Sequence, residues 1–203
     1  MDAIKNLQQR SRNERIVDLL NEVGMLRHTP RTGYQFLGTG KENVAEHSYR
    51  TAVIGYVLAK LAGADCARVT FLCLFHDLHE ARTGDFNYVN HIYNSTRART
   101  ALEHATAGTG LAEDILPLWD EMAAAASPEA RLAHDADQLD LLFNLKAESD
   151  KGNKFADDWM RSAVQRLKSP EAQELADIVL HTDHNLWWYA GPDASWWASR
   201  HGE

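Results

Sequence analysis

Residues 71–85, FLCLFHDLHEARTGD, constrain the fold of this chain more than any other stretch. The stretch begins as an apolar run and ends in ionisable side chains, namely His76, Asp77, His79, Glu80 and Asp85. Soluble proteins rarely place so many ionisable groups directly after a buried segment, because an unpaired buried charge is costly. Imidazole and carboxylate groups are ligands for divalent transition metals. The stretch therefore indicates a metal ion held where a buried helix ends.

The dipeptide His76-Asp77 carries little weight by itself. The chain has ten histidines, enough for one His-Asp pair to arise by chance. A second pair, His134-Asp135, is in fact present, and we expect it to face solvent. The two pairs differ in the residues that surround them, and in whether other candidate ligands lie at matching distances elsewhere in the chain.

The composition favours helices. Alanine outnumbers valine and isoleucine together by 28 to 15, and β-branched residues prefer strands. A length of 203 residues fits one domain with its own core. We therefore predict an all-α, single-domain helical bundle. The predicted helices cover residues 3–23, 44–61, 66–83, 111–125, 128–149 and 170–189, with one or two short helices within 86–110.

The predicted helix 66–83 points its apolar face inward. That face consists of Val69, Leu72 and Cys73. His76 continues the stripe at helical spacing, and Glu80 follows one turn later. Gly84 is expected to end the helix and to turn Asp85 back toward it.

Two other predicted helices carry candidate ligands. Asn43 and Glu46 form a variant of the capping box at the start of helix 44–61. His47 then lies on the inward face, where it would fit, taken alone, better as a core histidine than as a ligand. Helix 128–149 contains three aspartates: Asp135, Asp137 and Asp140. Aspartate is a poor residue for a helix interior, and we expect one of the three to be a ligand and the other two to be solvated.

Charge and composition exclude several kinds of partner. The net charge of −8 argues against broad binding to polymeric nucleic acid, which needs a basic face. The amino-terminal sequence is polar, and the longest uncharged apolar run, residues 51–59, is too short to span a membrane. Cys66 and Cys73 fit as reduced core residues. We therefore expect a cytoplasmic protein with no membrane partner.

The assembled pattern resembles the HD-domain metal-dependent phosphohydrolase superfamily, whose pattern is H…HD…D. Residues 42–48, ENVAEHS, are similar to a segment of the bacterial 5′-deoxynucleotidases of this superfamily. Residues 76–85 match their HDxxExxxGD run. Residues 136–139, ADQL, resemble the segment that supplies their last metal ligand.

Other segments are similar to a eukaryotic branch, the HD-domain-containing protein 2 group. These are PRTG at residues 30–33 and LW at residues 118–119. The resemblance covers about residues 19–148. We take residues 1–203 as a single HD domain, in which residues 153–203 add C-terminal helices and a tail rich in tryptophan, with Trp196 and Trp197 near its end.

The resemblance implies one divalent ion held by four side chains: His47, His76, Asp77 and Asp137. Two imidazoles and two carboxylates suit Mn²⁺, Co²⁺, Fe²⁺, Ni²⁺ or Zn²⁺ better than Mg²⁺. A second metal would need further histidines between the His-Asp pair and the last aspartate. His91 and His104 lie there without a matching motif, so one ion is predicted.

The resemblance also implies roles around that ion. Glu80 would orient or deprotonate a water molecule, or pass its proton on. Asp85 would protonate the leaving 5′-oxygen or hold the sugar. Arg31 would clamp phosphate oxygens, and Arg27 is the alternative for that role.

The implied activity is a nucleotide phosphomonoesterase that releases phosphate from deoxynucleoside 5′-monophosphates. A deoxynucleoside triphosphate triphosphohydrolase or a phosphodiesterase on the same site is the first alternative. A regulatory module that binds metal or nucleotide without turnover is the second. The expected partner is a small nucleotide, and a homodimer is the expectation at the level of the family.

Overall fold

The computed structural model describes residues 10–189 of the chain. Its helices are α2 (Arg12–Val23), the 3₁₀ helix η1 (Gly24–His28), α3 (Tyr34–Leu37), α4 (Val44–Ala62), α5 (Cys66–Phe75), α6 (Glu80–Thr83), α7 (Tyr88–Tyr93), α8 (Ala98–Thr106), α9 (Ala112–Ala124), α10 (Pro128–Asp150), α11 (Lys154–Arg166) and α12 (Pro170–His181). The only extended pairing among these residues is an isolated bridge between Pro30 and Asn43. The predicted all-α class is confirmed. None of these helices is long and apolar enough to cross a lipid bilayer.

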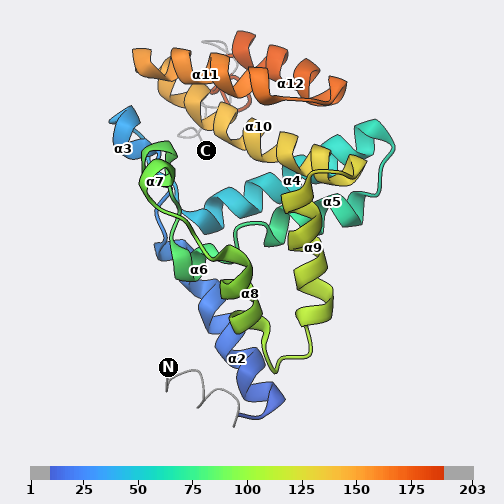
Figure 1. Ribbon diagram of the computed structural model, residues 1–203. Helices are drawn as coiled ribbons and strands as arrows, with labels where there is room; N and C mark the ends of the chain where they lie inside the picture. The colour runs from blue at the N-terminus through green and yellow to red at the C-terminus, as the bar shows by residue number, and fades with distance from the viewer. Residues whose placement is uncertain (1–9, 190–203) are drawn as a thin grey trace, which may run out of the picture.

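Helix α10 is the centre of the bundle. Figure 1 shows it between a layer formed by α11 and α12 and a second layer formed by α4 and α5, with α2, α6, α8 and α9 below. The core at this centre contains leucines that are almost fully buried: Leu58, Leu72, Leu139 and Leu142. Because α4, α5 and α10 each carry or end at a candidate ligand, the packing of these three helices determines where those ligands meet.

Glycine at position 55 allows α4 and α5 to approach closely. A Cβ atom at this position would lie 2.5 Å from Sγ of Cys73 and 3.1 Å from Cγ1 of Val69. Contacts that short cannot form in a well-packed interior without movement of a neighbour. Gly55 lies eight residues after His47 and therefore on the same face of α4, so this close packing holds His47 against the end of α5.

Side-chain caps begin α4, α5 and α10, and the capping box predicted at the start of α4 is confirmed. At α4, Asn43 Oδ1 accepts a hydrogen bond from the Glu46 backbone N–H at 2.9 Å, and Glu46 Oε2 accepts one from the Asn43 N–H at 3.2 Å. Asp65 caps α5, and Ser127 caps α10 ahead of a proline in its first turn. Helix α4 ends where Gly63 adopts a left-handed φ of 69°.

The predicted helix 66–83 is wrong in its middle, because α5 ends at Phe75 and α6 begins only at Glu80. Nδ1 of His76 donates to the Cys73 carbonyl oxygen at 2.7 Å. In a continuous α-helix that oxygen would accept from the Asp77 N–H. A side chain that competes for a backbone acceptor favours a break. The backbone hydrogen bonds that follow span three residues instead of the four of an α-helix. One example is the bond from the Glu80 N–H to the Asp77 carbonyl oxygen at 2.9 Å.

Two helix ends also differ from prediction. Helix α12 ends at His181, because Asp183 Oδ1 accepts the Asn185 N–H at 2.7 Å and forms a turn that competes with the helix. The first helix ends at Val23 as predicted, but α2 begins only at Arg12, where Ser11 and Glu14 form a capping box. Residues 3–9 of that predicted helix, and Trp196 and Trp197 of the tail, lie outside the described residues.

Candidate metal and substrate site

The structure brings the four predicted ligand positions together from three parts of the bundle. His47 comes from α4, His76 and Asp77 follow α5, and Asp137 comes from α10. Nε2 of His47 lies 3.3 Å from Nε2 of His76, 3.2 Å from Oδ1 of Asp137 and 3.5 Å from Oδ2 of Asp77. Nε2 of His76 lies 3.0 Å from the same Asp77 oxygen. Four donor atoms therefore converge on one point.

The hydrogen bonds of the two imidazoles fit a metal at that point. Nδ1 of His76 faces the Cys73 carbonyl oxygen, which can only accept, so this nitrogen carries the proton. Nδ1 of His47 lies 2.7 Å from Oδ2 of Asp140 and donates to that carboxylate. In the neutral rings both Nε2 atoms therefore keep their lone pairs, and these point to the cluster. An outer hydrogen bond of this kind fixes the tautomer in metal-binding histidines.

The charges around the point also fit a cation. Burial and the charge of Arg31 lower the pKa of His47, but hydrogen bonds with Asp137 and Asp140 outweigh both and raise it to about 10. Burial raises the pKa of Asp77 and of Asp137, but the neighbouring histidines lower both well below the usual range of a carboxyl group. The cluster thus holds carboxylates that attract positive charge, and metal ions compete with protons for such groups.

Arg31 reaches the cluster from the loop before α4. The loop is tied to the start of α4 by the Arg31 N–H to the Glu42 oxygen at 2.9 Å. Nη1 of Arg31 lies 3.2 Å from Oδ1 of Asp85 and 3.4 Å from Oδ2 of Asp77. The other candidate, Arg27, is exposed and bonded to its neighbour His28. Only Arg31 of these two arginines therefore lies at the site.

Asp85 holds that loop in place. Its Oδ2 accepts hydrogen bonds from the Thr32 backbone N–H at 2.5 Å and from the Thr32 hydroxyl at 3.0 Å. Its Oδ1 pairs with Arg31. Gly84, with a φ of 73°, makes the turn that returns Asp85 to this loop. The predicted turn at Gly84 is confirmed.

Glu80 is buried beside the cluster with one oxygen free of hydrogen bonds. Within residues 10–189, the buried side-chain atoms without a hydrogen-bond partner are Oε2 of Glu80 and Nδ2 of Asn87. Burial first, and then the charges of Asp77 and Asp85, raise the pKa of Glu80 to about 9. Shifts of this size with a free, buried oxygen are typical of groups that exchange protons during a reaction.

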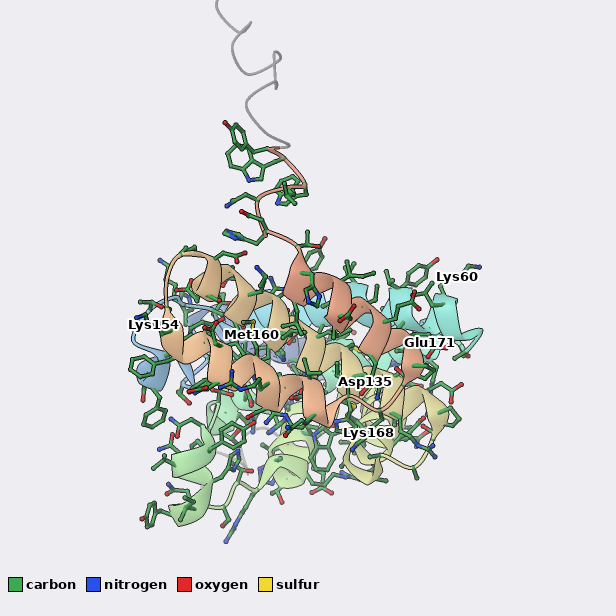
Figure 2. The ribbon with its side chains drawn as sticks, turned by 90° about the horizontal axis from the view of Figure 1, so that it is seen from above. Lys60, Asp135, Lys154, Met160, Lys168 and Glu171 are labelled. Atoms are coloured by element: carbon green, nitrogen blue, oxygen red, sulfur yellow. The ribbon has the colours of Figure 1, made fainter. Side chains whose placement is uncertain are left out.

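Two of the aspartates on α10 do not lie where the sequence predicted. Asp135 and Asp140 are buried rather than solvated, and the expected exposure of the pair His134-Asp135 is wrong. Asp135 accepts the backbone N–H groups of Lys168 and Ser169 at 2.8 and 2.7 Å and so fixes the start of α12, near the labels of Asp135 and Lys168 in Figure 2.

Asp140 is a site residue that sequence reasoning missed. It binds Nδ1 of His47 through Oδ2, and its Oδ1 accepts from Nε of Arg50 at 2.5 Å. Arg50 therefore places its positive charge next to Asp140, on the Nδ1 side of the His47 ring. The spacing was an available signal, because Asp140 follows Asp137 by three residues and lies on the same face of the helix.

A cavity of about 620 Å³ opens beside the cluster. Its polar wall contains Arg31, Asp77, Glu80, Asp85 and Asn87. Aromatic side chains from three other elements line it as well: Tyr34 and Phe36 of α3, Tyr88 of α7 and Trp159 of α11. A cavity of this volume, lined by aromatic and apolar side chains together with polar groups, is the usual form of a small-molecule site.

Known proteins resemble this chain along most of its length. A sequence model of the HD domain family matches residues 23–179, a span that contains all four candidate ligands. The 5′-deoxynucleotidase HDDC2 of Xenopus laevis is 27% identical over 179 residues, covering 83% of this chain and 88% of that protein. The protein of the same name from Mus musculus is 28% identical over 180 residues, covering 84% and 88%. A solved structure of a conserved hypothetical protein from Pyrococcus furiosus has a TM-score of 0.70 and 25% identity, over 82% of this chain and 99% of that one.

Proposed function

The chain belongs to the HD domain family, and on that premise we propose that it is a metal-dependent phosphohydrolase that releases phosphate from deoxynucleoside 5′-monophosphates. The observation that carries this proposal is the convergence of two imidazoles and two carboxylates beside a cavity large enough for a nucleotide. The substrate class is supported by relatives that are named 5′-deoxynucleotidases.

One divalent ion would be held by His47, His76, Asp77 and Asp137. Their mixed nitrogen and oxygen donors favour Mn²⁺, Co²⁺, Fe²⁺, Ni²⁺ or Zn²⁺ over Mg²⁺. When bound, such an ion supplies Lewis-acid activation of water and of a phosphate oxygen. His47 and His76 would be kept in the ligand tautomer by Asp140 and the Cys73 carbonyl.

The remaining groups would bind the phosphate and move the proton. Arg31 would orient phosphate oxygens with the N–H groups that Asp85 and Asp77 do not use. Glu80 would accept the proton of the attacking water at its free Oε2. A bond forms between that water oxygen and phosphorus, and the bond from phosphorus to the 5′-oxygen breaks. Asp85 would keep Arg31 in position, and either Asp85 or Glu80 would return a proton to the 5′-oxygen.

We also infer that the protein acts as a homodimer in the cytoplasm. The outward face of α4 supports the dimer, because its large apolar side chains are exposed: Tyr49, Val53, Tyr56 and Val57. Contiguous exposed apolar surface of this kind is typical of protein interfaces. Sedimentation equilibrium at micromolar concentration measures the state directly, and a monomer there would contradict this inference.

The activity test starts from protein stripped by a chelator and reloaded with Mn²⁺, Co²⁺, Mg²⁺ or Zn²⁺. Each form is assayed for phosphate release from deoxy- and ribonucleoside 5′-monophosphates, beside a His76→Ala variant. We expect metal-dependent release that favours deoxyribose and is lost in the variant. If no monophosphate is cleaved, the same forms are assayed with deoxynucleoside triphosphates and with phosphodiesters. Release of tripolyphosphate or opening of a diester would replace this proposal by the corresponding activity. Tight nucleotide binding without hydrolysis under every metal would indicate a regulatory module.

A further inference from the structure

Asn87 is a buried polar residue in the cavity that the proposed reaction does not use. The residue is only 7% exposed and lines the cavity. Its Oδ1 caps α7 by accepting the Asn90 backbone N–H at 2.9 Å. Its Nδ2 has no hydrogen-bond partner. A buried donor without a partner is costly, so Nδ2 is a candidate for contact with a bound molecule.

The cap settles which way the amide of Asn87 points. A backbone N–H can only donate, so the amide atom that faces Asn90 N must be the oxygen. A flipped amide would place two donors against each other and lose the cap. The unpartnered atom is therefore the nitrogen, and the group that it can bind must be a hydrogen-bond acceptor.

The position of Asn87 along the chain identifies the part of a nucleotide that it would meet. Asn87 follows Asp85 by two residues, at most about 7 Å along the backbone. Asp85 pairs with Arg31 at the phosphate end of the cavity. Among the aromatic side chains of the cavity that could stack on a base, Tyr34 and Trp159 come from α3 and α11. The sugar is the part of a nucleotide between its phosphate and its base.

Resting on the phosphomonoesterase function proposed above, we propose that Asn87 is a specificity-determining residue whose Nδ2 donates a hydrogen bond to the 3′-oxygen of the substrate sugar. In a 2′-deoxynucleotide the 3′-hydroxyl is the one free hydroxyl of the sugar. Its oxygen accepts, and its proton needs an acceptor in turn. The same wall of the cavity offers carboxylate oxygens for that proton at Asp85.

The test compares a 2′-deoxynucleoside 5′-monophosphate with the 2′,3′-dideoxy analogue of the same base. Asn87→Ser keeps a capping side chain for α7 but removes the nitrogen donor. Asn87→Asp keeps Oδ1 and replaces the donor by an acceptor. The metal-loaded wild-type protein should favour the deoxy substrate in kcat/KM. Both variants should lower that preference by about tenfold, the worth of one such hydrogen bond, through loss on the deoxy substrate alone.

Asn94→Ser is the matched control. Asn94 lies at the other end of α7, where its Nδ2 donates to the Asn90 carbonyl oxygen at the surface. This variant should leave the preference unchanged. An equal loss on both nucleotides in Asn87→Ser would show that Asn87 only caps α7, and it would overturn the proposal.

Dissociation constants for the two nucleotides, measured by calorimetry, separate this inference from the proposed function. If the wild-type protein releases no phosphate from any monophosphate, the proposed function fails. The ratio of the two dissociation constants still tests Asn87, because binding needs no turnover. A ratio that is the same in wild type and Asn87→Ser overturns the role of Asn87, whatever the activity.

Discussion

Replacing Glu80 by glutamine should lower kcat for phosphate release by about 10²–10⁴-fold, the usual contribution of a general acid or base. Glu80 is buried beside the cluster of candidate ligands, and its Oε2 has no hydrogen-bond partner. Burial and two neighbouring carboxylates raise its pKa to about 9. A divalent ion in the proposed site would lower that pKa, because a nearby opposite charge favours the ionised carboxylate, and would let Glu80 act as a base. Glutamine has the same shape but cannot carry the proton.

Glu148→Gln is the matched control for this substitution. Glu148 is also a buried glutamate, but it lies on α10 away from the cavity and pairs with Lys151 at 2.9 Å. Its replacement should leave kcat near the wild-type value. Metal content, measured on both variants, should equal that of the wild type. A Glu80→Gln protein with normal kcat would remove Glu80 from the reaction, and one that lost its metal would make Glu80 a ligand instead.

The sequence predicted best the features that depend on local chemistry. The start of α4 follows from Asn43 and Glu46, because a capping box is decided within four residues. The start of α10 follows from Ser127 and the proline after it. The inward position of His76 follows from a stripe of apolar residues at helical spacing, and His76 is indeed buried.

The features that the sequence could not predict depend on contacts between distant segments. The break after Phe75 arises because a histidine side chain takes a backbone acceptor, and a helical pattern does not reveal that choice. The burial of Asp135 is decided by the start of α12, more than thirty residues later. For Asp140 the spacing of three residues from Asp137 was an available signal, but its hydrogen bond to His47 of α4 is a contact between distant segments.

The convergence of the candidate ligands was predictable only in part. His47, His76 and Asp137 were singled out by motif, and no single helix contains two of them. Their meeting depends on how α4, α5 and α10 pack, for which the close approach at Gly55 is one visible requirement. Sequence reasoning could therefore name the residues, while the distances of 3.2 to 3.5 Å around His47 Nε2 needed the structure.

Replacing Asp140 by asparagine should weaken metal binding by about 10–100-fold, the usual effect of losing the outer partner of a ligand histidine. This prediction rests on the proposed ligand set. Asp140 is fully buried, and its carboxylate receives Nδ1–H of His47 at 2.7 Å. A neutral amide holds that ring less firmly and makes Nε2 less basic. Competition with a chromophoric chelator measures the change in affinity.

Asp135→Asn separates this effect from a general loss of stability. Asp135 is a buried aspartate on the same helix, but it binds the start of α12 and does not contact His47. Its replacement should lower the free energy of unfolding by about 1–3 kcal/mol, because buried donors lose a charged acceptor, and should leave metal affinity unchanged. Urea unfolding of both metal-free variants gives the stability. If the two substitutions weaken metal binding equally, Asp140 acts through the packing of α10, and its hydrogen bond to His47 has no separate role in holding the ion.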